Sequence, residues 1–393
     1  MPFGCPGFKT AGVAAGLKKN GARDLGLIYA GRPATVAGVF TRNRIQAAPV
    51  QLTRQRVAAG TCRALIVNSK NANCCTGAQG MTDALALTAL VARQLEIAEA
   101  SVLTASTGVI GSPMPMDKLT AAVPALVGAL AEGDVGPLAE SIMTTDTVPK
   151  AQRRHFSVGG HTATLVGVAK GAGMIRPDMA TLLCFVMSDV QGEPAVLQAA
   201  LGQAVDRSFN RISIDGDTST NDTCVLMASG VSGVRLDSAE ARAAFQETLD
   251  GLLAELARQL VADGEGVTKV VTVEVRGAPS DAEAGRIADT VAHSPLVKTA
   301  FFGQDANWGR ILAAAGRAGV DFDPRRSALF FDQVQMVDKG VGLGPEAENR
   351  ATAVLRQDAF SVTLDLGAGT GRATLLTCDF SVDYVKINAD YRS

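Results

Sequence analysis

Short runs rich in valine, isoleucine and leucine recur along the chain, and longer stretches with helical periodicity lie between them. These runs predict strands, and the clearest are residues 24–30, 34–41, 63–69, 163–171, 181–189 and 223–229. A period of 3.6 residues predicts helices over 81–97, 194–209 and 239–262, the last with an apolar stripe along one side. The pattern predicts a mixed α/β protein, although strands and helices alternate too irregularly for a doubly wound parallel sheet.

With 393 residues, the chain is long enough for two domains. A strand predicted over 269–275 leads into the turn-like segment VRGAPSD, residues 275–281, and then into a helix. Two helical stretches and three strand-like runs follow, at 327–331, 360–366 and 373–380. We therefore expect a catalytic core of residues 1–278 and a smaller C-terminal α+β domain of residues 279–393.

Composition argues against several classes of function. The net charge is −2 and no long basic run occurs, which gives no reason to expect a nucleic-acid partner. The sequence has no apolar run of transmembrane length, and its first residues lack the basic-then-apolar order of a signal peptide. Seven cysteines without a CxxC pair favour reduced thiols in the cytoplasm. Three histidines without an HExxH motif predict no metal site.

The glycine-rich segment VTLDLGAGTGRATLL, residues 362–376, resembles the nucleotide-binding loop of S-adenosylmethionine methyltransferases. Such a loop requires a following helix and strand, with an acidic residue about 20 positions further on. Here the next residues predict a strand and the chain ends at Ser393. We therefore expect the glycines to form a hairpin turn and do not expect a nucleotide cofactor.

Several polar segments could belong to a functional site, but each is weak evidence when taken alone. The loop SIDGDTSTND, residues 213–222, lacks EF-hand spacing, and its acids and hydroxyls fit either backbone capping or the lining of a cleft. Thr107 and Gly108 follow a predicted strand, where a hydroxyl and a backbone N–H could stabilise an oxyanion. Thr144 and Glu265 lie in polar turns, for which a helix cap and a solvated acid are the simpler interpretations.

The stretch KGAGMIRPDMATLLCF, residues 170–185, is the most unusual one. Ala180 and Thr181 lead directly into an apolar strand after a turn shaped by glycine and proline. A threonine hydroxyl is a poor nucleophile without a base, and no histidine is singled out as that base. The α-amine of Thr181 can serve if Thr181 becomes a chain N-terminus. An α-amine has an ordinary pKa of about 8, close to working pH.

An internal threonine becomes N-terminal when its hydroxyl attacks the preceding carbonyl, here that of Ala180, and water hydrolyses the resulting ester. The small side chain of Ala180 keeps that carbonyl accessible, and the β-branch of Thr181 restricts the direction of its hydroxyl. An ordinary threonine at the start of a strand explains the same residues. Residue chemistry alone leaves both interpretations open.

Eight motifs, spread over nearly the whole chain, resemble the ornithine acetyltransferase family, also called glutamate N-acetyltransferases, of the cyclic arginine pathway. They are ASTGVIG, TTDTVPK, KGAGMIRPDMAT, DGDTSTND, DGEGVTK, SPLVKTA, DANWGRI and DYVKINADYRS. The resemblance implies an αββα-type layered core, shared with self-processing aminopeptidases, and a smaller C-terminal α+β domain. It also implies self-cleavage between Ala180 and Thr181, after which the pieces stay together as an α2β2 assembly.

The resemblance further implies a reaction and its residues. Thr181 would take an acetyl group from N2-acetylornithine and pass it to glutamate in a ping-pong reaction. Thr107 and Gly108 would form the oxyanion hole. The implied substrate contacts are Thr144, Lys170, Thr181, Glu265, Asn388 and Ser393. Lys170 suits the carboxylate of the substrate, and Glu265 suits the side-chain ammonium of ornithine.

One departure from the family concerns the chain end. Many family members end in threonine, whereas this chain ends in Ser393. A role of the terminal carboxylate survives this change, but a role of the terminal side chain would be altered.

Other functions remain open at this stage. A self-processing aminopeptidase would use the same nucleophile with water as acceptor, whereas a non-catalytic small-molecule binder would keep its chain intact and would not need Thr181. The resemblance implies no cofactor, and nothing in the sequence decides whether acetyl-CoA is a second acetyl donor. The expected partners are small-molecule substrates and the cleaved chains themselves, with no nucleic acid and no membrane.

Overall fold

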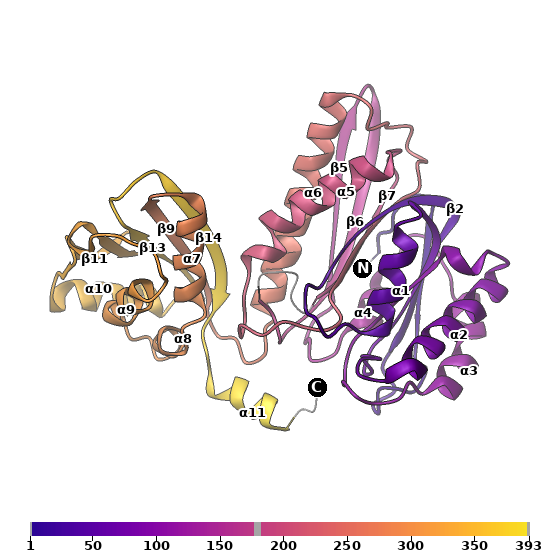
Figure 1. Ribbon diagram of the computed structural model, residues 1–393, viewed down its shortest axis with the longest axis horizontal. Coiled ribbons are helices and arrows are strands. Elements are labelled where there is room, and N and C mark those ends of the chain that lie inside the picture. Colours follow the sequence, from indigo (N-terminus) through magenta and orange to yellow (C-terminus); the bar gives the residue numbers. More distant parts are fainter. Residues whose placement is uncertain (1, 177–181, 391–393) are drawn as a thin grey trace. The chain divides into compact units, whose positions relative to one another are not determined.

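The computed structural model describes residues 2–176 and 182–390, and these residues form two compact units. The first unit contains nearly all of the chain up to Leu260, and the second contains Arg211–Gly216 together with the chain from Val261 onward. Each unit has its own sheet and its own hydrophobic core (Figure 1). The fold is mixed α/β with layered sheets, as the sequence predicts.

The first unit is built on one sheet with the strand order β4-β3-β2-β8-β7-β6-β5, and β1 pairs with β2. The strands are β1 (Phe8–Val13), β2 (Leu25–Phe40), β3 (Thr61–Asn68), β4 (Val102–Ser106), β5 (Lys150–Val158), β6 (His161–Lys170), β7 (Leu183–Ser188) and β8 (Thr223–Ala228). The pairs β3–β4 and β7–β8 run parallel, and the other pairs are antiparallel. The long β2 joins the two halves of the sheet, because its first part pairs with β3 and its second part with β8.

Helices and short 3-10 turns connect these strands. They are α1 (Ala48–Val57), α2 (Gly77–Leu95), η1 (Glu99–Ser101), α3 (Met116–Gly128), α4 (Gly136–Ile142), α5 (Pro194–Arg207), η2 (Phe209–Arg211) and α6 (Ala239–Ala262). The three helices predicted from periodicity correspond to α2, α5 and α6. Among residues 2–176 and 182–390, every helix is too short or too polar to span a membrane.

The sequence predicts two strands, at 24–30 and 34–41, where the structure has the single strand β2. This prediction was wrong because Gly31 and Pro33 resemble a turn signal. In the structure the pairing of β2 with β3 shifts register between Tyr29 and Ala34, which absorbs the intervening residues. A bulge of this kind bends a strand without ending it.

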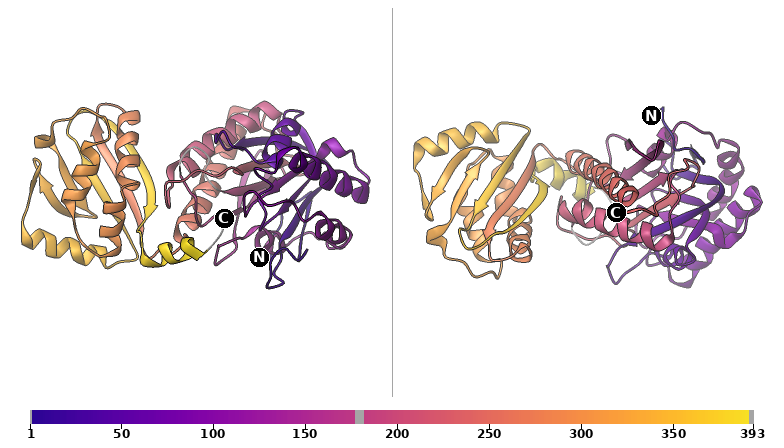
Figure 2. Two further views of the ribbon diagram at one scale, coloured as in Figure 1. Left: turned by 60° about the horizontal axis from the view of Figure 1, so that its bottom comes forward. Right: turned by 90° about the horizontal axis from the view of Figure 1, so that it is seen from above.

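Alternating side chains give the first unit its layers. Val67 of β3 and Phe185 of β7 belong to one inner core, which both halves of the sheet share with α4. The neighbouring residue on β3, Ile66, lies in a separate core with α2 and α3. On the outer face of the other half, Gly167 of β6 lies against Leu252 of α6. The resulting order is helices, sheet, sheet, helices, which is the expected αββα arrangement (Figure 1 and Figure 2).

The second unit contains a sheet with the order β12-β11-β10-β13-β9-β14. Its strands are β9 (Val270–Ala278), β10 (Ala328–Phe331), β11 (Val334–Asp338), β12 (Val341–Gly342), β13 (Ala359–Asp365) and β14 (Gly371–Cys378). Its helices are α7 (Asp281–Ala292), α8 (Pro295–Phe302), α9 (Trp308–Gly316), η3 (Pro324–Arg326), α10 (Pro345–Leu355) and α11 (Val382–Asp390). A core of mainly valine, alanine and leucine joins this sheet to its helices.

The two units divide the chain before the predicted boundary at residue 278. The strand β9 was assigned to the catalytic core, but it pairs with β13 on one side and β14 on the other, inside the second sheet. The turn after β9 therefore lies within the second unit. Sequence patterns locate the turn correctly but do not show which sheet the preceding strand joins.

The glycines of the segment VTLDLGAGTGRATLL do not form a hairpin, contrary to the prediction. The flanking strands β13 and β14 are not neighbours, because β9 lies between them. The connection passes over the end of β9, where a Cβ on Gly369 would lie 2.4 Å from the carbonyl oxygen of Ala278. A Cβ on Gly371 would lie 2.2 Å from the carbonyl carbon of Ser280. These glycines are explained by close backbone approach.

Candidate active site

Lys170 and Thr107, which the sequence analysis proposes separately, lie in contact. Lys170 is the last residue of β6, and Thr107 directly follows β4. The Nζ atom of Lys170 donates a hydrogen bond to Oγ1 of Thr107 at 3.3 Å, and both residues are buried. Because an ammonium can only donate, the hydroxyl hydrogen of Thr107 is directed elsewhere and can serve another acceptor.

Gly108 is required by the backbone at this point. Its φ of +133° is a conformation that favours glycine, and a Cβ would lie 2.3 Å from the carbonyl carbon of Lys70. The chain on either side is tied to the end of β3 and the loop after it. The N–H of Thr107 donates to the carbonyl of Asn68 at 3.0 Å, and that of Val109 donates to the carbonyl of Lys70 at 3.2 Å. Two backbone segments are thus held side by side, with the Thr107 hydroxyl beside Lys170.

Asp146 connects Thr144 to the end of β6. It accepts the backbone N–H of Thr144 at 2.9 Å and that of Gly171 at 2.8 Å. Nζ of Lys150 also donates to Asp146 at 2.8 Å, and this ion pair is almost completely buried. Burial opposes ionisation of Asp146, but Lys170 and Lys150 outweigh it and lower the pKa of this carboxyl to about 2. Asp146 is therefore an anion at neutral pH.

Asp222 lies beside the start of β7. Its Oδ1 accepts the N–H of Leu182 at 3.0 Å, and its Oδ2 has no hydrogen-bond partner among the described residues. Burial raises the pKa of Asp222 well above its ordinary value. This carboxyl is next to the residue that follows Thr181 in the sequence. The preceding residue, Asn221, donates to the carbonyls of Ala72 and Ser106 at 2.7 and 2.8 Å, so the loop also supports the strand end that carries Thr107.

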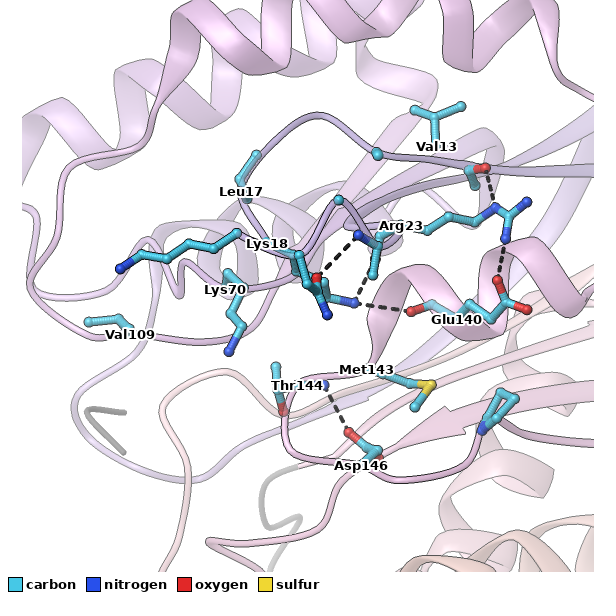
Figure 3. A pocket seen from close by; sticks show the side chains of 17 residues that line it. Val13, Leu17, Lys18, Arg23, Lys70, Val109, Glu140, Met143, Thr144 and Asp146 are labelled. Carbon is cyan, nitrogen blue, oxygen red and sulfur yellow. Dashed lines mark hydrogen bonds and ion pairs between the residues drawn. The ribbon is translucent and has the colours of Figure 1, made fainter. Parts of the chain in front are cut away.

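A groove of about 1230 Å³ opens beside Thr144 (Figure 3). Lys18, Lys70 and Arg23 line it, as do Glu140 and Asp146. Figure 3 shows Lys70 extending toward Thr144, and Lys18 on the loop that precedes β2. Burial is the main cause that lowers the pKa of Lys18, and the nearby Lys70 and Lys170 act in the same direction. The groove therefore lies within a cluster of cations and suits an anionic ligand.

Glu265 and Asn388 lie together in the second unit. Asn388 of α11 donates from Nδ2 to Oε2 of Glu265 at 2.8 Å. Gly266, with φ of +67°, follows Glu265, and a Cβ there would lie 2.4 Å from the backbone nitrogen of Tyr384. Ser381 donates to the carbonyl of Gly266 at 2.6 Å. The turn that carries Glu265 and the beginning of α11 are therefore packed closely.

The remaining predicted site residues, Ala180, Thr181 and Ser393, lie outside the described residues. The structure brings Thr107, Gly108, Thr144 and Lys170 into one neighbourhood in the first unit, and Glu265 and Asn388 into another in the second unit. Among the described residues, no cluster of three or more histidine, cysteine or acidic side chains could hold a metal ion. Cys74 and Cys75, like the other five cysteines, are free thiols.

Sequence reasoning missed Asp146 and Asp222 as members of the site. Both lie in motifs that it quotes, TTDTVPK and DGDTSTND, where an aspartate is equally typical of an exposed turn. The signal that distinguishes them is burial, which depends on tertiary contacts. The suggestion that the DGDTSTND loop lines a cleft described its polarity but did not single out Asp222.

A layered α/β core with buried ionisable and hydroxyl side chains gathered at its strand ends is typical of enzymes that act on small polar substrates. The ArgJ family model matches residues 9–393. The chain is 52% identical over 389 residues to the arginine biosynthesis bifunctional protein ArgJ of Geobacter sulfurreducens, and the match covers 98% of this chain and 99% of that protein. The protein of the same name from Syntrophotalea carbinolica is 52% identical over 392 residues, with coverages of 98% and 99%.

A solved structure agrees with these sequence matches. The crystal structure of the arginine biosynthesis bifunctional protein ArgJ of Bacillus halodurans has a TM-score of 0.50 and 40% sequence identity, covering 53% of this chain and 98% of that chain. The chain belongs to the ArgJ family. The family resemblance seen in its motifs is thereby confirmed.

Proposed function

We propose that the protein transfers an acetyl group from N2-acetylornithine to glutamate through an acetyl ester on Thr181. Membership of the ArgJ family, whose curated relatives carry a name in arginine biosynthesis, supports a role in this pathway. The observation that carries the chemical assignment is the contact between Lys170 and Thr107, because it joins a carboxylate-binding cation to an oxyanion donor.

The nucleophile forms by self-cleavage. The Thr181 hydroxyl attacks the Ala180 carbonyl, the peptide C–N bond breaks as an ester forms, and water hydrolyses that ester. The products are a chain ending at Ala180 and a chain beginning with the α-amine of Thr181. The new amine then takes the proton of the Thr181 hydroxyl during acetyl transfer.

Acetyl transfer proceeds in two balanced halves. The Thr181 oxygen attacks the acetyl carbon of acetylornithine, and the α-amine of ornithine leaves with the proton. The amine of glutamate then attacks the acetyl ester, and the proton returns to the Thr181 oxygen. In each half the Thr107 hydroxyl and the Gly108 N–H donate hydrogen bonds to the oxyanion. Loss of one such donor lowers the rate by a factor of about 10²–10³.

The other predicted residues bind the substrate. Lys170 and Thr144 contact the α-carboxylate of the amino acid, for which the cationic surroundings of Thr144 are suited. Glu265 contacts the side-chain ammonium of ornithine, and Asn388 fixes the direction of the Glu265 carboxylate through their hydrogen bond. Ser393 is the remaining proposed substrate contact.

We further propose that acetyl-CoA is a second acetyl donor to glutamate, as a substrate and not a cofactor, and that the cleaved chains form an α2β2 assembly in the cytoplasm. The name of the curated relatives, a bifunctional protein, supports two activities. A donor assay with glutamate and either acetylornithine or acetyl-CoA tests the first proposal, and sedimentation of the cleaved protein tests the second.

The main experiment incubates the purified protein with acetylornithine, with and without glutamate, and quantifies acetylglutamate, ornithine and free acetate. Acetylglutamate formed in step with ornithine supports the transferase. Free acetate that forms at the same rate without glutamate would instead identify a hydrolase of the aminopeptidase type.

A further inference from the structure

Asp146 lies between two segments to which the proposed function assigns substrate binding. Thr144 belongs to the loop between α4 and β5, whereas Lys170 is the last residue of β6. Oδ2 of Asp146 accepts the N–H of Thr144 at 2.9 Å, and Oδ1 accepts the N–H of Gly171, the neighbour of Lys170, at 2.8 Å. One buried carboxylate therefore sets the spacing of the two segments.

The same carboxylate is the anion within a buried group of cations. Lys150 donates to Oδ1 at 2.8 Å, and the exposed fractions of the two side chains are 1% for Lys150 and 0% for Asp146. Lys170 interacts electrostatically with Asp146, and Lys18 does so from the opposite side of the groove. Lys170 also interacts electrostatically with Asp222, whose pKa burial raises. Asp146 is therefore an anion that several lysines share, and these lysines suit the negative charge of a substrate α-carboxylate.

We propose that Asp146 is a positioning residue of the acetyl-transfer site, which aligns Thr144 with Lys170 and pairs with Lys150 so that it does not draw Lys170 away from the substrate. This inference rests on the proposed function, because it takes Thr144 and Lys170 as substrate contacts. Asp146 acts through these residues, because both of its oxygens accept protein donors and its negative charge repels the substrate α-carboxylate.

Substitutions of Asp146 and Lys150 should change the site in opposite directions. In Asp146→Asn, Lys150 and Lys170 lose the carboxylate that they share, Lys18 and Lys70 keep their positive charge nearby, and Asp222 still interacts with Lys170. An ammonium in such surroundings loses its proton at lower pH. In Lys150→Met, Asp146 loses its hydrogen-bonded cation and attracts Lys170 more strongly, so Lys170 keeps its proton to higher pH but is drawn toward Asp146.

The test measures KM and kcat for acetylornithine between pH 6 and pH 10, a range of about four units around the ordinary pKa values of an α-amine and a lysine. For Asp146→Asn we expect the alkaline rise of KM to begin about one unit below that of the wild type. For Lys150→Met we expect KM to be about tenfold higher at neutral pH and its alkaline rise to move upward. Asp146→Glu keeps the charge and should keep the wild-type pH profile with a lower kcat.

Asp323→Asn is the matched control. Asp323 likewise accepts a backbone N–H from a residue two positions away and pairs with a cation, Arg325, but it lies partly exposed in the second unit. This variant should leave both KM and kcat for acetylornithine unchanged.

The pH profiles of Asp146→Asn and Lys150→Met decide whether Asp146 has this role. Profiles that coincide with that of the wild type, or that shift in the same direction, would overturn it. Should Asp146→Asn fail to fold or to cleave itself, Lys150→Met and Asp146→Glu decide the question. A wild-type protein without transferase activity would refute the proposed function, and this inference with it.

Discussion

At the scale of single residues, the proposed chemistry depends on hydroxyl and ammonium groups that neighbouring residues orient. Lys170 can only donate to Thr107, so the Thr107 hydroxyl is left to donate to a developing oxyanion. Sequence motifs identify both residues through the family resemblance. Their contact could not be predicted, because it joins β4 and β6, which lie in opposite halves of the sheet.

Replacing Lys170 by alanine should weaken the binding of acetylornithine. A hydrogen bond to a charged group contributes roughly 1.5–3 kcal/mol, so we expect the dissociation constant or KM to rise by about 10–150-fold. Steady-state kinetics measures this change, with Lys19→Ala as control, because Lys19 is an exposed lysine of the same groove. If KM and kcat of Lys170→Ala equal those of the wild type, Lys170 has no part in substrate binding.

Asp146 should contribute to stability in a pH-dependent way. Its pKa is lowered from an ordinary 3.8 to about 2, so the folded state binds fewer protons than the unfolded state. The resulting stabilisation, about 2 kcal/mol, is present above pH 4 and is lost as the pH falls from about 4 to about 2. Urea unfolding should therefore show Asp146→Asn to be less stable than the wild type at pH 7. A difference that persists undiminished at pH 2 would contradict this assignment.

At the scale of elements, the site is formed by strand ends and the loops that follow them. The strand that ends at Lys170 and the strand that precedes Thr107 were predicted, because apolar runs identify strands whether or not their pairing is known. The single strand β2 and the crossing over β9 were not predicted. In both places glycine or proline suggested a turn, and long-range pairing determined the outcome.

Gly108 allows a specific prediction about the loop after β4. Gly108→Ala should destabilise the loop after β4, because a Cβ meets the backbone of Lys70 at 2.3 Å and the φ of +133° is unfavourable for alanine. Loss of the aligned N–H should also lower kcat by about 10²-fold or more. Gly128→Ala is the control, since no atom lies within 4 Å of a Cβ at this helical position. Equal activities and melting temperatures for the two variants would exclude a special role of Gly108.

At the scale of the whole molecule, the family resemblance predicted the layered core, and the structure and the comparisons confirm it. The domain boundary could not be placed from sequence, because the pattern of β9 shows a strand but not the sheet that it joins. The buried acids Asp146 and Asp222 were missed for a related reason, since burial is a property of the folded molecule. The motifs thus identify the family better than they identify the buried residues that support the candidate site.

In the proposed mechanism, Thr181 becomes an N-terminal residue and carries the acetyl group. Intact-mass spectrometry of the purified protein, before and after incubation with acetylornithine in the absence of glutamate, tests it most directly. We predict two fragments that meet between Ala180 and Thr181. The second should gain the mass of one acetyl group, located on Thr181, and lose it when glutamate is added. A fully active protein that remains a single chain of 393 residues, or an acetyl group on any residue other than Thr181, would contradict the account.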